Sequence, residues 1–367
     1  MMLLGSLWWL LAAGQLGKYL GAGAALATLP LALLAFAAYP RWRDRRPWRG
    51  AAASPRAPRL LALAAVLIFA ILYPIAAAHL LGPGSERGPG LDRALAALLA
   101  GHDPYGARTP LGHPIDALPG SLLFALPFHL LGTAALQNPM WLALLILRSA
   151  AWFARPVDAV AFSALVLVNP GFMQDYATGG DFFASAVAVF LAADLAMSAF
   201  GRERASGRKL VAILVFTLAL NTRPIYAVAL PVIAAEIGRR AGWREAARFA
   251  AAVAALSLAL ELPFYFADPA GFTPLTAVRK AAALPGAVWI LPPLAVLSTG
   301  LAFAWRLDGA GAMALIGTSL AIMLLPPVLA EQLRYGFTPG TLYALPAYLF
   351  LGLGLFGAVG RRQTDSG

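Results

Sequence analysis

The chain has 367 residues, of which 60% are hydrophobic and only 12% are charged, and its mean hydropathy is +0.73. Soluble domains average roughly 45–50% apolar and about 25% charged residues, so a water-soluble fold would leave too much apolar surface exposed. The net charge of +11 would suggest a nucleic-acid partner in a soluble protein, but here the arginines gather in short runs between apolar stretches. The composition therefore predicts an integral membrane protein and argues against nucleic acid as a partner.

The reactive side chains are few. The absence of cysteine excludes a disulfide framework, thiolate catalysis and cysteine-ligated metal sites. The four histidines are scattered, so no metal cluster and no cofactor are expected, while a requirement for a divalent metal stays open. The first apolar segment, Met2–Leu16, has no basic n-region and no cleavage site, which favours a retained helix over a removed signal peptide.

Thirteen apolar segments predict one all-α domain over 1–367, a polytopic bundle of about 11–13 transmembrane helices. The clearest is Leu60–Leu81, whose roughly 22 residues are interrupted only by Pro74 and His79 and can cross a hydrocarbon core of about 30 Å. Several others are shorter than about 17 residues and predict tilted, broken or re-entrant helices. The remaining segments are 2–16, 18–39, 119–133, 138–154, 157–171, 181–199, 209–221, 223–237, 246–265, 286–304, 309–329 and 338–360.

Basic runs predict the orientation, because short loops rich in Lys and Arg stay in the cytoplasm. The N-terminal helices and the loop after them, residues 1–59, end in such a run, and others lie at 202–209, 239–248 and 361–362. Both termini are then inside, and the segments facing outward are 82–118, 266–285 and 330–337. Three full crossings between Gly132 and Gly201 would place the 202–209 run outside, so either 138–154 or 157–171 is expected not to cross completely.

The segment 82–118 is the long hydrophilic outer loop, and its length of more than about 15 residues indicates a functional or disordered loop. Apolar residues recur on a helical pattern from Leu91 to Ala100 and end at Gly101, which predicts a short helix at the membrane surface. A carboxylate at the mouth of an apolar cavity can take a proton from an attacking hydroxyl. The carboxylates of the loop are Glu86, Asp92, Asp103 and Asp116.

Each of these carboxylates also has a structural interpretation. Asp103 precedes Pro104, where a turn is the stronger interpretation because aspartate bonds its own backbone there. Asp92 lies at the start of the predicted helix and is either a cap or a base. Glu86, in the stretch GPGSERGPG, has no capping role, so it is either functional or simply solvated.

A second group of polar residues runs from Asn169-Pro170 through Gln174 to Asp181, at the head of the apolar segment 181–199. Ionisable residues at such positions are candidates for function, and helix capping is the alternative for Asp181. Arg223 lies between two short apolar segments and would cost about 2.5–3.5 kcal/mol at the bilayer centre, so it requires a partner, either a phosphate or a buried carboxylate.

Other basic residues raise the same question. Arg148 lies within a predicted span and is expected to snorkel to the interface. Arg279, Lys280 and Arg334 are expected outside, where they either bind an anionic head group or are ordinary basic residues at helix ends.

Three features follow one another in and after the outer loop. They are Leu91-Asp92 through Leu99, then Gly101-His102-Asp103-Pro104-Tyr105, and then Pro114 with the apolar segment from Leu122 to Gly132. Together they resemble the first outer loop of polyprenyl-phosphate-sugar-dependent glycosyltransferases of the C superfamily, especially glycosyltransferase family 87. The segment from Asn169 to Asp181, Arg223-Pro224, and Leu262-Pro263 with Asp268-Pro269 resemble later motifs of that family. The likeness covers most of the chain from about residue 60.

The chain departs from the family pattern at two places. The acid of the first loop usually lies about fourteen to sixteen residues before the turn glycine, at Glu86 or Arg87 here, where aspartate would be usual. The usual Tyr-Pro-Pro after the turn is replaced by His113-Pro114. A catalytically degenerate member is therefore one alternative.

The resemblance implies the fold of that superfamily and an inverting transfer of a sugar, often mannose, from a lipid phosphate to an acceptor hydroxyl at the outer face of a prokaryotic plasma membrane. The donor is a lipid-linked sugar, and the acceptor is a glycan, a lipid or a protein. Glu86 or Asp92 is then the base, and Arg223 or Arg334 stabilises the leaving phosphate. Further substrate contacts are expected from Asp103, Tyr105, His113, Gln174 and Asp181.

Two other classes of function remain open from the sequence. A transporter or flippase would also have broken helices and intramembrane charges such as Arg148 and Arg223, although such proteins often contain inverted repeats and none is visible here. A structural or scaffolding membrane protein would not need so elaborate an outer loop.

Overall fold

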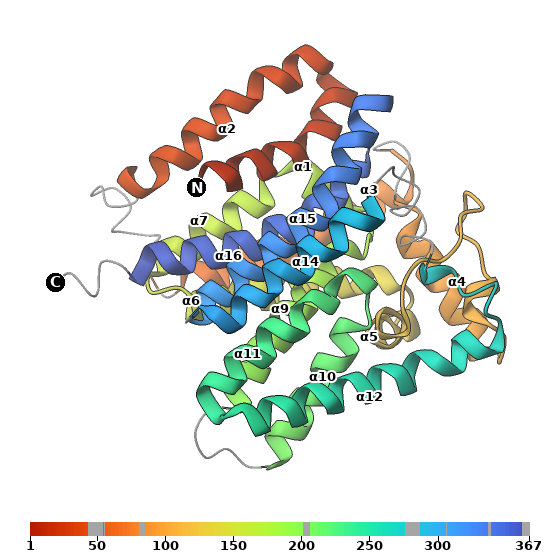
Figure 1. Ribbon diagram of the computed structural model, residues 1–367. Helices are drawn as coiled ribbons and strands as arrows, with labels where there is room; N and C mark the ends of the chain where they lie inside the picture. Colours follow the sequence, from red (N-terminus) through yellow and green to blue (C-terminus); the bar gives the residue numbers. More distant parts are fainter. Residues whose placement is uncertain are drawn as a thin grey trace.

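The computed structural model describes residues 1–42, 54, 56–80, 85–200, 206–275, 287–305, 307–336 and 339–361. Within these ranges the chain is 84% helical and has no strand, which confirms the all-α class. The helices form one polytopic bundle (Figure 1). In its N-terminal half the α-helices are α1 (Met2–Leu20), α2 (Ala22–Trp42), α3 (Ala57–Ala77), α4 (Arg87–Leu99), α5 (Pro119–Leu130), α6 (Gln137–Trp152), α7 (Pro156–Leu167), α8 (Pro170–Ala177) and α9 (Phe182–Ala199).

The C-terminal half continues the same pattern of long helices joined by short 3₁₀ turns. Its α-helices are α10 (Ser206–Leu220), α11 (Ala229–Ala241), α12 (Trp243–Ala267), α14 (Ala287–Ala304), α15 (Gly309–Tyr335) and α16 (Leu345–Arg361). The 3₁₀ helices are η3 (Pro104–Gly106), η4 (Ala134–Leu136), η5 (Pro224–Val228), η6 (Thr273–Leu275) and η7 (Pro339–Ala344).

By length and composition, six of the described helical segments are able to cross a membrane, which makes the chain an integral membrane protein. Two further spans are possible as bent pairs: α5 with 134–152, bent by 100°, and α7 with α8, bent by 75°. The short, broken pieces predicted in this region are therefore present, and six to eight spans among the described residues are long and apolar enough to cross a membrane by themselves. The six are α2, α3, α9, α12, α15 and 341–358.

The physical reason for the two bends lies in the residues at the breaks. Gly132 has φ +128°, a backbone conformation that favours glycine, and it separates α5 from η4. At the second break Asn169 accepts hydrogen bonds from the backbone N–H groups of Gly171 and Phe172, which starts α8 in a new direction. Short apolar stretches thus change direction inside the bundle, so that each bent pair is either one broken span or a re-entrant loop.

Helix α9 forms the centre of the bundle. Its sequence is apolar around almost the whole helix apart from Asp194, and 78% of its most hydrophobic window is buried among α6, α10, α11 and α16. Helices α2, α3 and α12 are apolar too, but only 22%, 22% and 11% of their windows are buried. Helices with this much exposed apolar surface are expected to face lipid, because exposure of that surface to water is unfavourable.

The outer loop folds into a cap with a small apolar core of its own. Leu91 and Leu95 of α4, Tyr105, Leu122 of α5 and Phe272 are all buried in this second cluster. The predicted surface helix is present, although α4 begins at Arg87 rather than Leu91. It ends as predicted, because Gly101 has φ +76° and its N–H and that of His102 bond back to Leu98 and Ala97.

The structure describes only part of two segments that were predicted to face outward, 330–337 and 266–285. In the segment 330–337, α15 continues to Tyr335 and stops at Gly336, where φ is +77°, and residue 337 lies outside the described residues. Of 266–285, residues 266–275 are described, and Arg279 and Lys280 lie outside the described residues.

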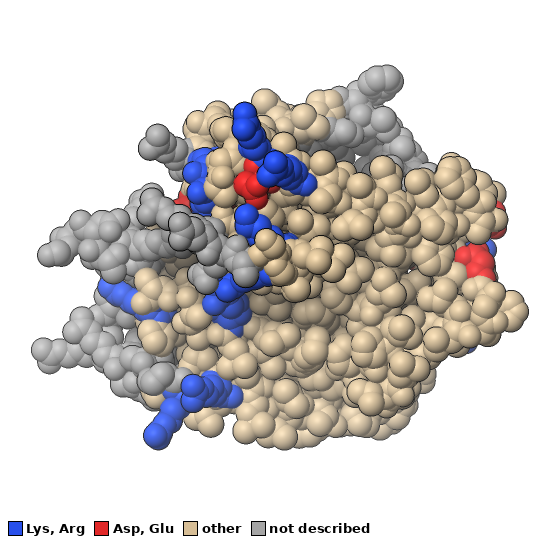
Figure 2. Space-filling model, turned by 90° about the horizontal axis from the view of Figure 1, so that it is seen from below, with Lys and Arg blue, Asp and Glu red and all other residues tan. Residues whose placement is uncertain are grey.

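Charged side chains gather toward the two ends of the bundle. Figure 2 shows most of the Lys and Arg of this face toward one end, with acidic residues among them, further acidic residues at the opposite end, and a broad uncharged surface between. The basic end includes Lys209 at the start of α10 and Arg239 and Arg248 near the turn between α11 and α12. Figure 1 shows α4 and the outer loop at the end away from that turn, as expected if basic loops and the outer loop lie on opposite sides of the membrane.

Candidate functional site

The outer loop is attached to the bundle through the start of α5. The backbone N–H of Leu118 donates to the carbonyl of Thr222 (3.2 Å), and that of Gly120 donates to the carbonyl of Asn221 (2.8 Å). The Ser121 hydroxyl also donates to the Thr222 carbonyl (3.1 Å). These bonds satisfy otherwise unpaired N–H groups of the first turn of α5 and place the preceding loop beside Arg223.

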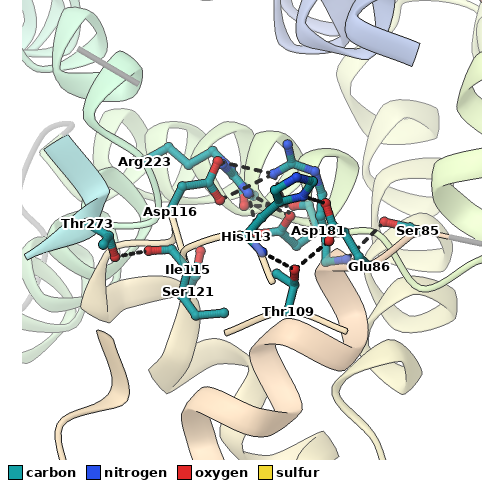
Figure 3. Close-up of polar contacts among 12 residues, drawn as sticks. Ser85, Glu86, Thr109, His113, Ile115, Asp116, Ser121, Asp181, Arg223 and Thr273 are labelled. Carbon is teal, nitrogen blue, oxygen red and sulfur yellow. Dashed lines mark hydrogen bonds and ion pairs between the residues drawn. The ribbon is translucent and has the colours of Figure 1, made fainter. Parts of the chain in front are cut away.

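Four charged side chains meet at this junction. Arg223 donates to both carboxylate oxygens of Asp181 (2.6 Å each) and approaches Asp116 (3.4 Å). Arg87, at the start of α4, approaches Asp116 (3.4 Å) and Asp181 (3.8 Å). We call Arg87, Asp116, Asp181 and Arg223 the charge cluster; Figure 3 shows its Asp116, Asp181 and Arg223.

The arginines of the charge cluster pack against aromatic side chains. The guanidinium of Arg87 lies 3.9 Å from the ring centroid of Phe182, and that of Arg223 lies 4.3 Å from it. Arg87 also donates to the Tyr343 hydroxyl (3.3 Å). Arg223 is only 5% exposed and Asp181 only 2%, so their attraction is screened little by water. The Nε of Arg223 has no hydrogen-bond partner among the described residues, which leaves a buried cationic donor unused.

The ionisation of the loop residues in the cluster is fixed by their neighbours. Burial alone would raise the pKa of Asp116, but the adjacent Arg223 and Arg87 lower the pKa to about 2. Burial would likewise lower the pKa of Arg87, but Asp116 and Asp181 raise it. Asp116 and Arg87 therefore stay charged at neutral pH, and each of the two arginines of the cluster lies within ion-pair distance of two carboxylates.

A second polar group lies next to the cluster in the chain. The carboxylate of Glu86 accepts hydrogen bonds from the hydroxyl of Thr109 and from Nδ1 of His113 (Figure 3). The Thr109 hydroxyl in turn accepts from the His113 backbone N–H (3.0 Å). Burial opposes ionisation of Glu86, but these two hydrogen bonds and the neighbouring Arg87 lower its pKa. Glu86 is thus an ionised carboxylate with both oxygens occupied.

Close backbone packing places Glu86 and Arg87. A Cβ on Gly88 would lie 2.6 Å from the carbonyl oxygen of Gly179, so only glycine lets α4 approach the turn before Asp181 this closely. The glycine-rich stretch around Glu86 therefore joins the outer loop to the α8–α9 turn.

Asp92 occupies a different place. Its carboxylate accepts from His129 Nδ1 (2.7 Å), the Thr133 hydroxyl (2.8 Å) and the Ala134 backbone N–H (2.7 Å). It therefore holds the turn between α5 and η4 rather than capping its own helix, and it has no described bond to the charge cluster.

We expect Asp92→Asn to lower the free energy of unfolding by about 1–3 kcal/mol, because an amide cannot accept all three bonds and leaves a partner unsatisfied. Thermal unfolding in detergent measures this. Asp103→Asn is the matched control, since asparagine keeps the one acceptor oxygen used there. An equal loss of stability in both variants would contradict the role of Asp92.

Other predicted substrate residues have structural partners. Asp103 accepts from the Tyr105 backbone N–H (3.1 Å) and caps η3, as the turn interpretation predicts. Tyr105 is 1% exposed, and its ring packs against Phe264 and Phe272. Gln174 bonds to Gln15 of α1.

Two further arginines lie outside the charge cluster: Arg148 is paired within the bundle, and Arg334 is exposed. Arg148 does not snorkel alone: its guanidinium binds Asp194 through two hydrogen bonds (2.6 and 3.0 Å), because α9 presents a carboxylate to α6. Arg334 is exposed near the end of α15, over the ring of Tyr335, and has no described contact with the charge cluster.

Sequence reasoning missed Arg87 as a member of the site, and it named Asp116 without its ion pairs. Arg87 was considered only as a position where an acid would be usual, and Asp116 only as one of the loop carboxylates. The one sequence feature that could have pointed to Arg87 is its position between Glu86 and the Gly-Pro-Gly stretch of the outer loop. Neither Phe182 nor Tyr343 carried a signal in the sequence, because aromatic residues are frequent throughout the chain.

A cavity lies on the bundle side of Asp181. Its lining combines Asp181, Ser121, Gln137, Ser185 and Thr222 with the apolar side chains of Phe124, Trp141, Ala184 and Ala188. Within the described parts of the chain no three His, Asp or Glu side chains group as metal ligands. Comparison with protein-family models, with characterised proteins and with solved structures finds no match.

Proposed function

We propose that the protein is a membrane glycosyltransferase that moves a sugar, mannose or a related hexose, from a polyprenyl-phosphate donor to an acceptor hydroxyl at the outer face of a prokaryotic plasma membrane. One observation carries the proposal. Three segments far apart in the sequence, which resemble successive motifs of such enzymes, meet at one site: the outer loop, the turn before Asp181, and Arg223.

The charge cluster suits the leaving phosphate. When the bond between sugar and phosphate breaks, negative charge grows on the phosphate, and fixed cationic donors in a site with little water stabilise it most. Arg87 and Arg223 are guanidinium groups, which match phosphate oxygens in geometry, and Arg223 has an unused Nε–H. Asp116 and Asp181 hold both arginines in position before the donor arrives.

The surroundings suit the other substrates. The exposed apolar surfaces of α2, α3 and α12 place the protein in the membrane, where a lipid-linked donor resides. The pair of Glu86 and His113 lies beside the cluster, where a proton must be removed from the acceptor hydroxyl. With the basic end in the cytoplasm, this site faces outward.

The test is transfer of radiolabelled sugar from polyprenyl-phosphate donors, mannose and glucose among them, to lipid, glycan and peptide acceptors in proteoliposomes. We expect the wild type to transfer sugar and Arg87→Gln to lower kcat/KM by about 10²–10³-fold, as for loss of one charge-stabilising donor. Arg93→Gln on the same helix, whose side chain bonds only to the Arg108 carbonyl in the described contacts, should leave transfer unchanged.

No transfer by the wild type with any donor would overturn the proposal. Movement of the lipid-linked sugar between leaflets without transfer would instead favour a transporter or flippase, whose substrate pathway would include the buried Arg223 and Asp181.

A further inference from the structure

The imidazole of His113 is held in one position by the outer loop. Residues 108 and 114 form an isolated antiparallel bridge, and the Thr109 N–H donates to the His113 carbonyl (2.9 Å). Gly112 at the turn has φ +82°. The His113 N–H donates to the Thr109 hydroxyl, and its ring binds Glu86, yet 64% of the side chain remains exposed. A ring that is fixed and still accessible can meet a substrate.

Glu86 determines which ring nitrogen is available. An ionised carboxylate only accepts hydrogen bonds, so the Nδ1 that faces Glu86 carries the proton. The neutral ring then keeps its lone pair on Nε2. This is the arrangement in which a carboxylate orients a histidine so that the far nitrogen acts as a base.

Glu86 is itself poorly suited to take the proton. Both of its oxygens already accept hydrogen bonds, and its lowered pKa makes it a weaker base than an ordinary carboxylate. General bases work best when their conjugate acid titrates near the working pH, which is the range of imidazole rather than of a stabilised carboxylate.

We infer that His113 is the general base of the proposed sugar transfer and that Glu86 is a positioning residue acting through it. Nε2 of His113 takes the proton of the acceptor hydroxyl, and the hydroxyl oxygen forms its bond to the anomeric carbon. The bond from that carbon to the phosphate oxygen breaks, and its electron pair leaves with the polyprenyl phosphate, beside Arg87 and Arg223. This inference rests on the proposed function and names the base within its site.

The charged neighbours of this pair keep their charge between pH 5 and pH 8. Arg87 and Arg93 of α4 and Arg108 of the hairpin remain cationic at all accessible pH values. The pKa of Asp116, about 2, keeps it anionic above pH 5. Transfer should therefore decline as the pH falls from 8 to 5, because a protonated imidazole cannot accept a proton.

The experiment measures kcat and donor KM from pH 5 to pH 8 for the wild type, His113→Gln, Glu86→Gln and His102→Gln in proteoliposomes. We expect His113→Gln to lower kcat by about 10²–10⁴-fold, with unchanged donor KM and no decline toward acid pH. Glu86→Gln should lower kcat while keeping the acid decline, because the imidazole is still present but less well oriented. His102, an exposed histidine of the same loop, is the matched control and should behave as wild type.

Each outcome decides between the alternatives. A wild type that transfers sugar together with a His113→Gln variant that keeps the same kcat and acid decline would overturn the inference and leave the proposed function standing. If Glu86→Gln alone removed both activity and the acid decline, Glu86 would be the base. A wild type without transfer would remove the proposed function and this inference with it. Unfolding temperatures equal to wild type show that the variants are folded, as expected for the exposed His113 side chain.

Discussion

Replacement of Arg223 by methionine is expected to lower the free energy of unfolding by about 3–5 kcal/mol, the usual cost of removing one partner from a buried ion pair. Asp181 is 2% exposed and would keep only the more distant Arg87, at 3.8 Å, as a cationic neighbour. Asp116 would lose one of its two arginines as well. Thermal unfolding in detergent, with the same membrane-protein preparation for each variant, measures the loss.

Arg148→Met is the matched control, because it removes an arginine from a bidentate pair whose side chains are partly exposed, 39% for Arg148 and 15% for Asp194. We expect it to cost about 1 kcal/mol or less, as for accessible pairs. The double variant Arg223→Met with Asp181→Leu should recover some of the loss, because the buried carboxylate leaves together with its partner. Equal losses at Arg223 and Arg148 would show that the charge cluster is hydrated and not a buried network.

Gly120→Ala is expected to be the second severe change, with a loss of about 3 kcal/mol, at the upper end of the cost of overpacking. The added Cβ would lie 2.1 Å from the Leu218 carbonyl oxygen and 2.6 Å from that of Asn221. These are backbone atoms that cannot rotate away. The start of α5 must therefore separate from the α10–η5 turn, which breaks the backbone bonds to Asn221 and Thr222 and draws Asp116 away from Arg223.

Gly207→Ala in α10 is the control for this prediction, since a Cβ there meets nothing within 4 Å. It should leave the unfolding temperature unchanged or raise it slightly, because alanine favours a helix over glycine by up to about 1 kcal/mol. Unfolding temperatures for both variants, together with sugar transfer, provide the measurement. A Gly120→Ala variant as stable and active as Gly207→Ala would refute the close packing between α5 and the turn.

The candidate site is formed by three connections between helices that contact one another: the outer loop, the α8–α9 turn and the α10–η5 turn. Glycines permit the close approach at two of them, Gly88 at Gly179 and Gly120 at Leu218 and Asn221. The charged side chains then neutralise one another around the buried pair of Arg223 and Asp181, which orients the arginines before any ligand binds.

Among the predicted site residues, the structure separates those that have structural partners from those available for chemistry. Asp92 and Asp103 hold turns, Gln174 bonds to α1, and Arg334 lies on the surface. Asp181 and Arg223 come together with Arg87 and Asp116, and Glu86 meets His113. The requirement that Arg223 have a buried carboxylate partner, one of the two alternatives open from the sequence, is met by the protein itself.

The amino-acid sequence by itself determined the membrane class, the position of nearly every helix, and the end of α4 at Gly101. Hydrophobicity and glycine conformation are local properties, so the order of residues carries them directly. It did not determine how many short helices cross the membrane, because a bend at Gly132 or Asn169 depends on what the neighbouring helices leave room for. It also did not determine which charges pair. Arg87, Asp116, Asp181 and Arg223 are spread over more than a hundred residues, and only the packing of α5 and α9 against the outer loop brings them within ion-pair distance.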